Sequence, residues 1–157
     1  MKNSGNTREN FSMLFAEIKS VMPEEGTYDS VYVVQNGKFR FVNPQFAAAG
    51  GFTEKEMLGM ESARIIHPDD RDEARENAIQ MLKGERTLPY TFRIIAKDGS
   101  VKWIQETVHA ITYKGKRAVL GNSMDVTAHR EAMEKLRDLQ ALQNSILDAL
   151  PIAVLGM

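Results

Sequence analysis

The sequence contains no cysteine and shows no excess of charge of either sign. Without cysteine the chain cannot form disulfides, zinc knuckles, a c-type haem attachment or the cysteinyl adduct of flavin photochemistry. Twenty basic residues against twenty-one acidic ones give a formal net charge of -1. Because nucleic-acid surfaces need clustered excess Lys and Arg, this balance argues against a nucleic-acid partner.

Long apolar runs are also missing. No run approaches the roughly 20 residues that cross a bilayer. Residues 1–10 are polar and lack the apolar region of a signal peptide. We therefore expect a cytoplasmic protein without direct membrane insertion. The 157 residues, of which 43% are hydrophobic, leave room for one domain and one or two further helices.

The first part of the chain predicts an amphipathic helix and a compact hairpin. Apolar residues recur at helical spacing over residues 8–22. Such a helix either covers its own domain or forms a dimer contact, and the sequence leaves both open. Segments 31–35 and 38–42 flank Asn36-Gly37, a pair typical of a two-residue β-hairpin turn.

Capping signals then predict a series of helices. Asn43 before a proline and the capping box that starts at Thr53 each begin a short helix. His67 precedes a proline and two aspartates, which suit the first turn of a longer helix and oppose its dipole better than they would bind a metal. The buried stripe of that helix comprises Ala74, Ala78, Ile79 and Leu82.

Three longer strands and a final helix follow, over residues 88–97, 100–113, 117–125 and 127–150. Alternation in the first strand predicts one apolar face, formed by Leu88, Tyr90, Phe92 and Ile94.

The final helix carries the spacing of a coiled coil, with apolar residues that alternate by three and four positions. This seam consists of Ala132, Leu136, Leu139, Gln143, Ile146 and Leu150. The polar Gln143 interrupts it as register-fixing residues do. Pro151 ends the helix, and residues 151–157 suggest the start of a following domain that is cut short.

The order of these elements and several short strings resemble the PAS family of sensory domains. The strings are Asn43-Pro44-Gln45-Phe46, Gly51-Phe52-Thr53, Leu58-Gly59, Ile66-His67-Pro68-Asp69-Asp70-Arg71, Phe92-Arg93, Lys97-Asp98-Gly99-Ser100, Trp103 and Asp125-Val126-Thr127. Each string alone is weak, but the full series agrees in order and spacing over about residues 27–127.

The resemblance implies an α+β fold: a five-stranded antiparallel sheet with short helices over one face, flanked by an N-terminal amphipathic helix and a C-terminal coiled-coil helix. We expect a lead-in over residues 1–26, the PAS domain over 27–127, a signalling helix over 128–150 and a truncated domain from 151.

The resemblance also implies a core between the sheet and its helices that sometimes holds a ligand. The candidate pocket residues are Val33, Phe41, Phe46, Ile79, Phe92, Ile94, Leu120 and Asn122. The same residues would line a solid core, so packing alone remains the simpler interpretation. A buried Asn122 would need hydrogen-bond partners, from the backbone or from a ligand.

The sequence leaves the cofactor open between none and a small molecule held without a covalent bond. Haem fits poorly, because His67 reads as a helix cap and His109 as a packed residue in the middle of a strand. A flavin needs only a slot and hydrogen-bond donors, and Trp103 either stacks on it or forms part of the central strands. His129 resembles a solvated helix position rather than a kinase phosphoacceptor.

The expected function is a sensory or relay module, not an enzyme. Asp125 and Thr127 can bind backbone amides and set how the exit helix leaves the sheet. A core signal would pass through them to a coiled coil in a homodimer and then to downstream domains of the same chain, and the parent protein we expect is a sensor histidine kinase. The alternatives are a ligand-free dimerisation or spacer module, the input domain of a diguanylate cyclase, and a small enzyme that uses His109.

Overall fold

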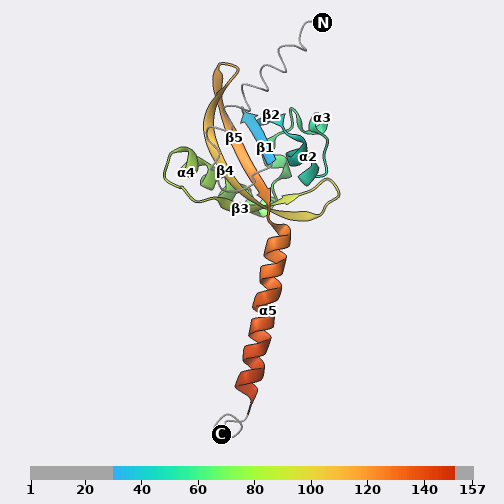
Figure 1. Ribbon diagram of the computed structural model, residues 1–157. Helices are drawn as coiled ribbons and strands as arrows, with labels where there is room; N and C mark the ends of the chain where they lie inside the picture. Colours follow the sequence, from blue (N-terminus) through green and yellow to red (C-terminus); the bar gives the residue numbers. More distant parts are fainter. Residues whose placement is uncertain (1–29, 151–157) are drawn as a thin grey trace.

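The computed structural model describes residues 30–150, which form one sheet, the helices that cover it and one long projecting helix (Figure 1). The strands are β1 (Ser30–Gln35), β2 (Lys38–Val42), β3 (Tyr90–Ile95), β4 (Val101–Tyr113) and β5 (Lys116–Asp125). The helices are α2 (Pro44–Ala49), α3 (Glu54–Met57), the 3-10 turns η1 (Ser62–Ile65) and η2 (Pro68–Asp70), α4 (Arg71–Leu82) and α5 (Thr127–Ala149).

The five strands form one antiparallel sheet in the order β2-β1-β5-β4-β3. The expected five-stranded α+β architecture is thus confirmed. Chain order and sheet order differ because β5 returns to the centre, between β1 and β4. The last strand therefore contacts both halves of the sheet before the chain leaves through α5.

Local sequence signals explain most element boundaries. Asn36 and Gly37 both have positive φ, at 54° and 74°, as the predicted hairpin turn requires. The Asn43 side chain accepts a hydrogen bond from the amide of Phe46 and starts α2. Thr53 and Glu56 complete the predicted capping box at α3. His67 caps η2 through Nδ1, which accepts from the amide of Asp69 at 3.2 Å.

The two faces of the sheet carry two separate apolar clusters. The main cluster lies between the sheet and the covering helices and includes Tyr32, Phe39, Val42, Met57, Tyr90, Phe92, Ile94, Ile104 and Val108. The other cluster consists of Val31, Val33, Ala118 and Leu120, with Phe41, Ile111 and Tyr113 packed against it. Because strand residues alternate between faces, neighbours in the sequence belong to opposite clusters.

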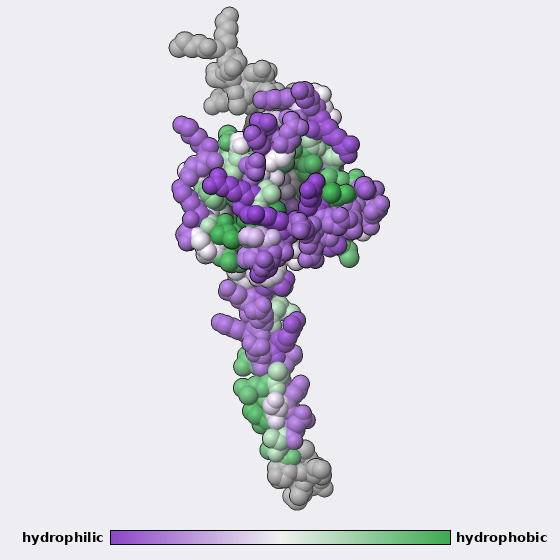
Figure 2. Space-filling model, turned by 180° about the vertical axis from the view of Figure 1, so that it is seen from behind, coloured by the Kyte–Doolittle hydropathy of each residue, from purple (hydrophilic) through white to green (hydrophobic). Residues whose placement is uncertain are grey.

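Helix α5 points away from the sheet and exposes a row of apolar side chains (Figures 1 and 2). Its exposed large hydrophobic residues are Met133, Leu136, Leu139, Leu142, Ile146, Leu147 and Leu150. Met133, Leu142 and Leu147 flank the predicted seam and widen it.

One predicted core residue is misplaced. Leu88 lies before β3 begins and is 72% exposed, because the strand starts only after Pro89. The predicted helix over residues 8–22 and the segment 151–157 lie outside the described residues. Within residues 30–150, no helix combines the length and apolar character needed to span a membrane.

Gly121 on β5 leaves space for the ring of Tyr32, which lies opposite it on β1. It pairs with Tyr32 of β1, and a Cβ atom at Gly121 would lie 2.1 Å from Tyr32 Cζ. The tyrosine ring therefore lies directly over the glycine backbone, where any side chain would displace it.

We predict that Gly121→Ala lowers the free energy of unfolding by about 1–3 kcal/mol, because the added methyl group forces the Tyr32 ring to move. Urea unfolding followed by circular dichroism measures this. Ser123→Ala, two positions along the same strand and face, adds no atom and is the matched control. An unchanged Gly121→Ala protein would mean that the ring has room to move.

Candidate functional site

A cavity of about 660 Å³ lies between the sheet and the helices that cover it. Its walls come from all five strands and from α2, α3, α4 and η1. The interior wall is mostly apolar and includes Val34, Met57, Ala74, Ala78, Leu82, Ile104, Val108 and Val119. This volume is in the range of small-molecule sites in proteins.

Glu106 of β4 is the one charged residue among the buried ones in the described chain, at 5% exposure. Tyr32 donates a hydrogen bond to its Oε1 at 2.5 Å, and Tyr90 donates to its Oε2 at 2.6 Å. Burial raises the pKa of Glu106 to about 7, although both tyrosine hydrogen bonds act in the opposite direction. Glu106 therefore changes charge near neutral pH.

Both tyrosines remain protonated donors at that pH. Burial, followed by the charge of Glu106, raises the pKa of Tyr32 and that of Tyr90 well above the ordinary tyrosine value. The three residues come from β1, β3 and β4, so they join separate strands at one point inside the cavity wall.

Other aromatic rings pack against the two tyrosines that bind this carboxyl group. Tyr32 lies with its centroid 5.5 Å from that of Phe39 and 4.8 Å from that of Phe46. Tyr90 and Phe92 are 6.0 Å apart on the other side. All five rings line the cavity.

The predicted pocket residues divide between the two faces of the sheet. Phe46, Phe92 and Ile94 line the cavity. Ile79 is half-buried on α4 and does not line it. The placement of the other four in the pocket is wrong, since they belong to the opposite face; they are Val33, Phe41, Leu120 and Asn122. The apolar pattern of a strand does not say which face of the sheet the helices cover.

Asn122 nevertheless is unusual. It is fully buried and lies opposite Thr107 of β4. Among the described residues, neither its Oδ1 nor its Nδ2 nor the Thr107 Oγ1 has a hydrogen-bond partner. The expected partners of Asn122 are therefore absent from this part of the chain.

The junction between β5 and α5 is held by a small hydrogen-bond network. Asp125 Oδ1 accepts from the Thr127 amide at 3.0 Å and from its hydroxyl at 2.6 Å. Thr127 Oγ1 in turn accepts from the Trp103 amide at 2.9 Å, and the Val126 amide donates to the Trp103 carbonyl at 2.8 Å. The first residue of α5 is thus joined to β4 as well as to β5. Asp125 also lines the cavity.

Trp103 lies at this junction and is not among the residues that line the cavity, which fits the alternative that it forms part of the central strands. The Arg130 guanidinium of α5 lies 3.6 Å from the Trp103 ring centroid, and that of Arg93 lies 5.6 Å away. Arg93 also forms an ion pair with Asp70 at 2.6 Å. These contacts link the start of α4 to the first turn of α5.

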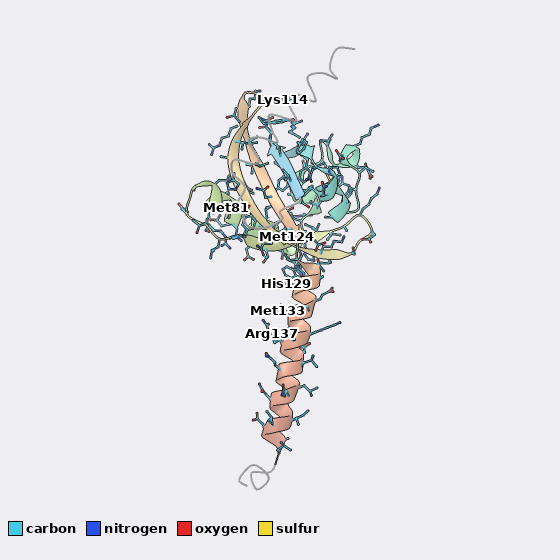
Figure 3. The ribbon with its side chains drawn as sticks, in the orientation of Figure 1. Met81, Lys114, Met124, His129, Met133 and Arg137 are labelled. Carbon is cyan, nitrogen blue, oxygen red and sulfur yellow. The ribbon has the colours of Figure 1, made fainter. Side chains whose placement is uncertain are left out.

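The histidines lie apart from the cavity. His67 caps η2, and His109 is half-buried on the outer face, opposite Leu120, where burial lowers its pKa. His129 is exposed on α5 (Figure 3). No group of three or more potential metal ligands occurs within residues 30–150.

The site residues missed in the sequence are Glu106, its two tyrosine partners and Arg130. A signal for Glu106 was present, because β4 places it between Ile104 and Val108 on the apolar face of an alternating strand. A carboxylate at such a position is rare without partners. The contact of Arg130 with Trp103 had no comparable signal, since it depends on the exit angle of α5.

Comparisons with known proteins identify the fold independently. The sequence pattern of the family described as the PAS fold matches residues 39–121, more than half of the chain. An uncharacterised protein of Sinorhizobium fredii is 25% identical over 123 residues, which cover 76% of this chain. The chain spans only 14% of the length of that relative.

Two solved structures share the architecture. One is a sensory box histidine kinase/response regulator from Burkholderia thailandensis, with a TM-score of 0.59 at 22% identity over 74% of this chain and 90% of that one. The other is the N-terminal domain of a diguanylate cyclase with PAS/PAC sensor from Marinobacter aquaeolei, with a TM-score of 0.52 at 21% identity over 64% and 97%. At these identities the likeness concerns the fold alone.

The raised pKa of Glu106 predicts that stability falls as the pH rises from about 4.5 to about 7. In that window the folded protein holds a proton at Glu106 that the unfolded chain has released, so the free energy of unfolding decreases by up to about 3 kcal/mol. Urea unfolding across this range measures the slope.

Glu106→Gln cannot titrate and should remove this component. The pKa of Asp70 is lowered to about 2, so its effect on stability changes only below this pH range. The pKa of His109 is lowered by burial, so its contribution makes the free energy of unfolding rise with pH. Both remain in the variant, so subtraction isolates Glu106. Equal slopes in the two proteins would contradict the assignment.

Proposed function

Because the chain belongs to the PAS fold family, we propose that it is a sensory relay module of a longer signalling protein, in which the state of the cavity sets the geometry of a paired α5 helix. One observation carries this proposal: Asp125 lines the cavity and also binds the first residue of α5, Thr127, through two hydrogen bonds. Asp125 would thus give the cavity a direct hydrogen-bonded link to the exit helix, beside the contacts of Trp103 with Thr127, Val126 and Arg130.

The route from the cavity to α5 has few steps. Ser123 and Asp125 lie on the cavity side of β5, two residues apart, and Ser123 pairs with Glu106 on β4. Movement of β5 relative to β4 changes the distance between Asp125 and Trp103, which Thr127 bridges. Since Arg130 lies on the Trp103 ring one turn further along, such a shift would tilt or rotate α5.

The exposed face of α5 supports a second copy of this chain as the partner. Leu136, Leu139 and Ile146 are 55%, 62% and 56% exposed, although they follow the spacing of a coiled-coil seam. These apolar side chains of α5 are not covered by the rest of the described domain. A parallel pair of α5 helices would bury it and place two copies of the domain side by side.

The parent protein is proposed to be a sensor histidine kinase, with a diguanylate cyclase as the second candidate. The support is the presence of both among the similar folds. A ligand-free dimerisation module is the alternative, and the exposed seam alone would serve it equally well. The two functions differ in whether the cavity controls α5.

We predict that Leu139→Asp weakens self-association of the 157-residue chain by about tenfold or more, because it places an unpaired carboxylate in the seam. Sedimentation equilibrium measures the dimer constant. Ala141→Asp introduces the same charge on the opposite side of α5 and should leave the constant within about twofold. A monomeric parent chain would overturn the paired-helix proposal.

Filling the cavity should alter α5. We predict that Ala78→Phe, which adds a ring inside the cavity, changes the distance between spin labels on α5 in the two copies. Because the chain lacks cysteine, Ser145→Cys provides a single labelling site, and pulsed electron resonance measures the distance.

Two controls test the route. Ala110→Phe adds the same ring at an exposed position of β4 and should leave the distance unchanged. Asp125→Ala combined with Ala78→Phe should restore the parent distance, because the link to Thr127 is gone. An unchanged distance in Ala78→Phe itself would favour the ligand-free spacer.

A further inference from the structure

Glu106 is a buried carboxyl group that lines an aromatic cavity and has no cationic partner within residues 30–150. The ion pairs within residues 30–150 do not involve it, and its hydrogen bonds come from the neutral hydroxyls of Tyr32 and Tyr90. Buried carboxylates are ordinarily paired with a positive charge or held protonated. The site thus offers two oriented donors to the carboxylate but no counter-charge.

The carboxylate keeps capacity for a further partner. Each carboxylate oxygen has two acceptor positions, and each Glu106 oxygen accepts one tyrosine hydroxyl. One position on each oxygen remains for a donor from the cavity. A protonated amine supplies such donors together with the missing charge.

The cavity wall adds a second feature that favours a cation. Tyr32, Phe39, Phe46, Tyr90 and Phe92 all line it, and the three phenylalanines pack against the two tyrosines that bind the carboxyl group. Aromatic faces attract organic cations, and more strongly where water is excluded. An anion would meet both the carboxylate and the negative ring faces.

The charged residues at the exposed edge of the cavity, its rim, do not supply the missing positive charge for Glu106. The rim cations Lys38, Arg71 and Arg75 are all exposed, and three exposed carboxylates from Glu61, Asp72 and Asp125 balance them. The residues of α4 that line the cavity and are not exposed are all apolar, namely Ala74, Ala78 and Leu82. Once Glu106 is ionised, the interior therefore carries one negative charge, while the six charges at the rim sum to zero.

We propose that this cavity binds a small organic cation, an apolar primary or secondary amine whose ammonium group pairs with Glu106 inside the ring of aromatic side chains. The inference rests on the proposed function, since it names the ligand class of the same sensory cavity. Binding keeps Glu106 ionised and forms a charge pair next to Ser123, which pairs with Glu106 across the sheet. A shift of β5 at Ser123 would then move Asp125, two residues further along the same strand.

The test compares isosteric probes on the full 157-residue chain: 2-phenylethylamine, 2-phenylethanol and phenylacetate. Titrations followed by amide chemical shifts give the dissociation constants and show which residues respond. We expect the amine to bind about tenfold or more tightly than the alcohol, and phenylacetate to bind weakest. Affinity for the amine should rise about tenfold between about pH 6 and about pH 8, as Glu106 ionises while Tyr32 and Tyr90 keep their protons.

Glu106→Gln should lower the affinity for the amine to that of the alcohol and remove its pH dependence. Glu73→Gln, which neutralises an exposed carboxylate of α4 that does not line the cavity, is the matched control and should leave the amine affinity within about twofold. Equal affinity for alcohol and amine, tighter binding of phenylacetate, or no response of the cavity residues to the amine would each overturn the inference.

The α5 label distance separates this inference from the proposed function. If the alcohol or phenylacetate fills the cavity and changes that distance, the ligand class is wrong and the relay stands. If the amine binds through Glu106 and the distance stays constant, the ligand class stands and the relay is wrong.

Discussion

The hydrogen bonds of Glu106 with Tyr32 and Tyr90 are the interaction on which the interior of this protein depends. They join β1, β3 and β4 at a point that packing alone would fill with apolar side chains. A buried carboxyl group is stable only with such donors, so its partners must hold their positions. The requirement extends to Gly121, because only glycine leaves space for the Tyr32 ring above β5.

The same strands place a second network at the edge of this interior. Alternation along β4 directs Glu106 into the cavity and Trp103 to the opposite face. Asp125, at the end of β5, contacts both regions, since it lines the cavity and binds Thr127. The cavity and the base of α5 are therefore a few residues apart on two adjacent strands, which is a short path for mechanical coupling.

Local signals were sufficient wherever a short segment determines its own structure. The turn at Asn36-Gly37, the capping box at Thr53 and the start of α5 at Thr127 all occur as predicted. Asp125 and Thr127 also form the expected hydrogen bonds to backbone amides, for the same reason. The pocket residues were predicted less well. Asn122 and Leu120 were assigned to the pocket but lie on the other face of the sheet, because an apolar pattern alone does not say which face the helices cover.

The sequence by itself determined the order of strands and helices, the caps and turns that bound them, and the apolar row along α5. These depend on backbone preferences and on spacing within one segment, which adjacent residues specify. Only the tertiary structure decided that β5 lies between β1 and β4, that Glu106 meets tyrosines 74 and 16 residues away, and that Arg130 rests on Trp103. Such contacts depend on strand pairing across the whole chain, where one position of register changes every face.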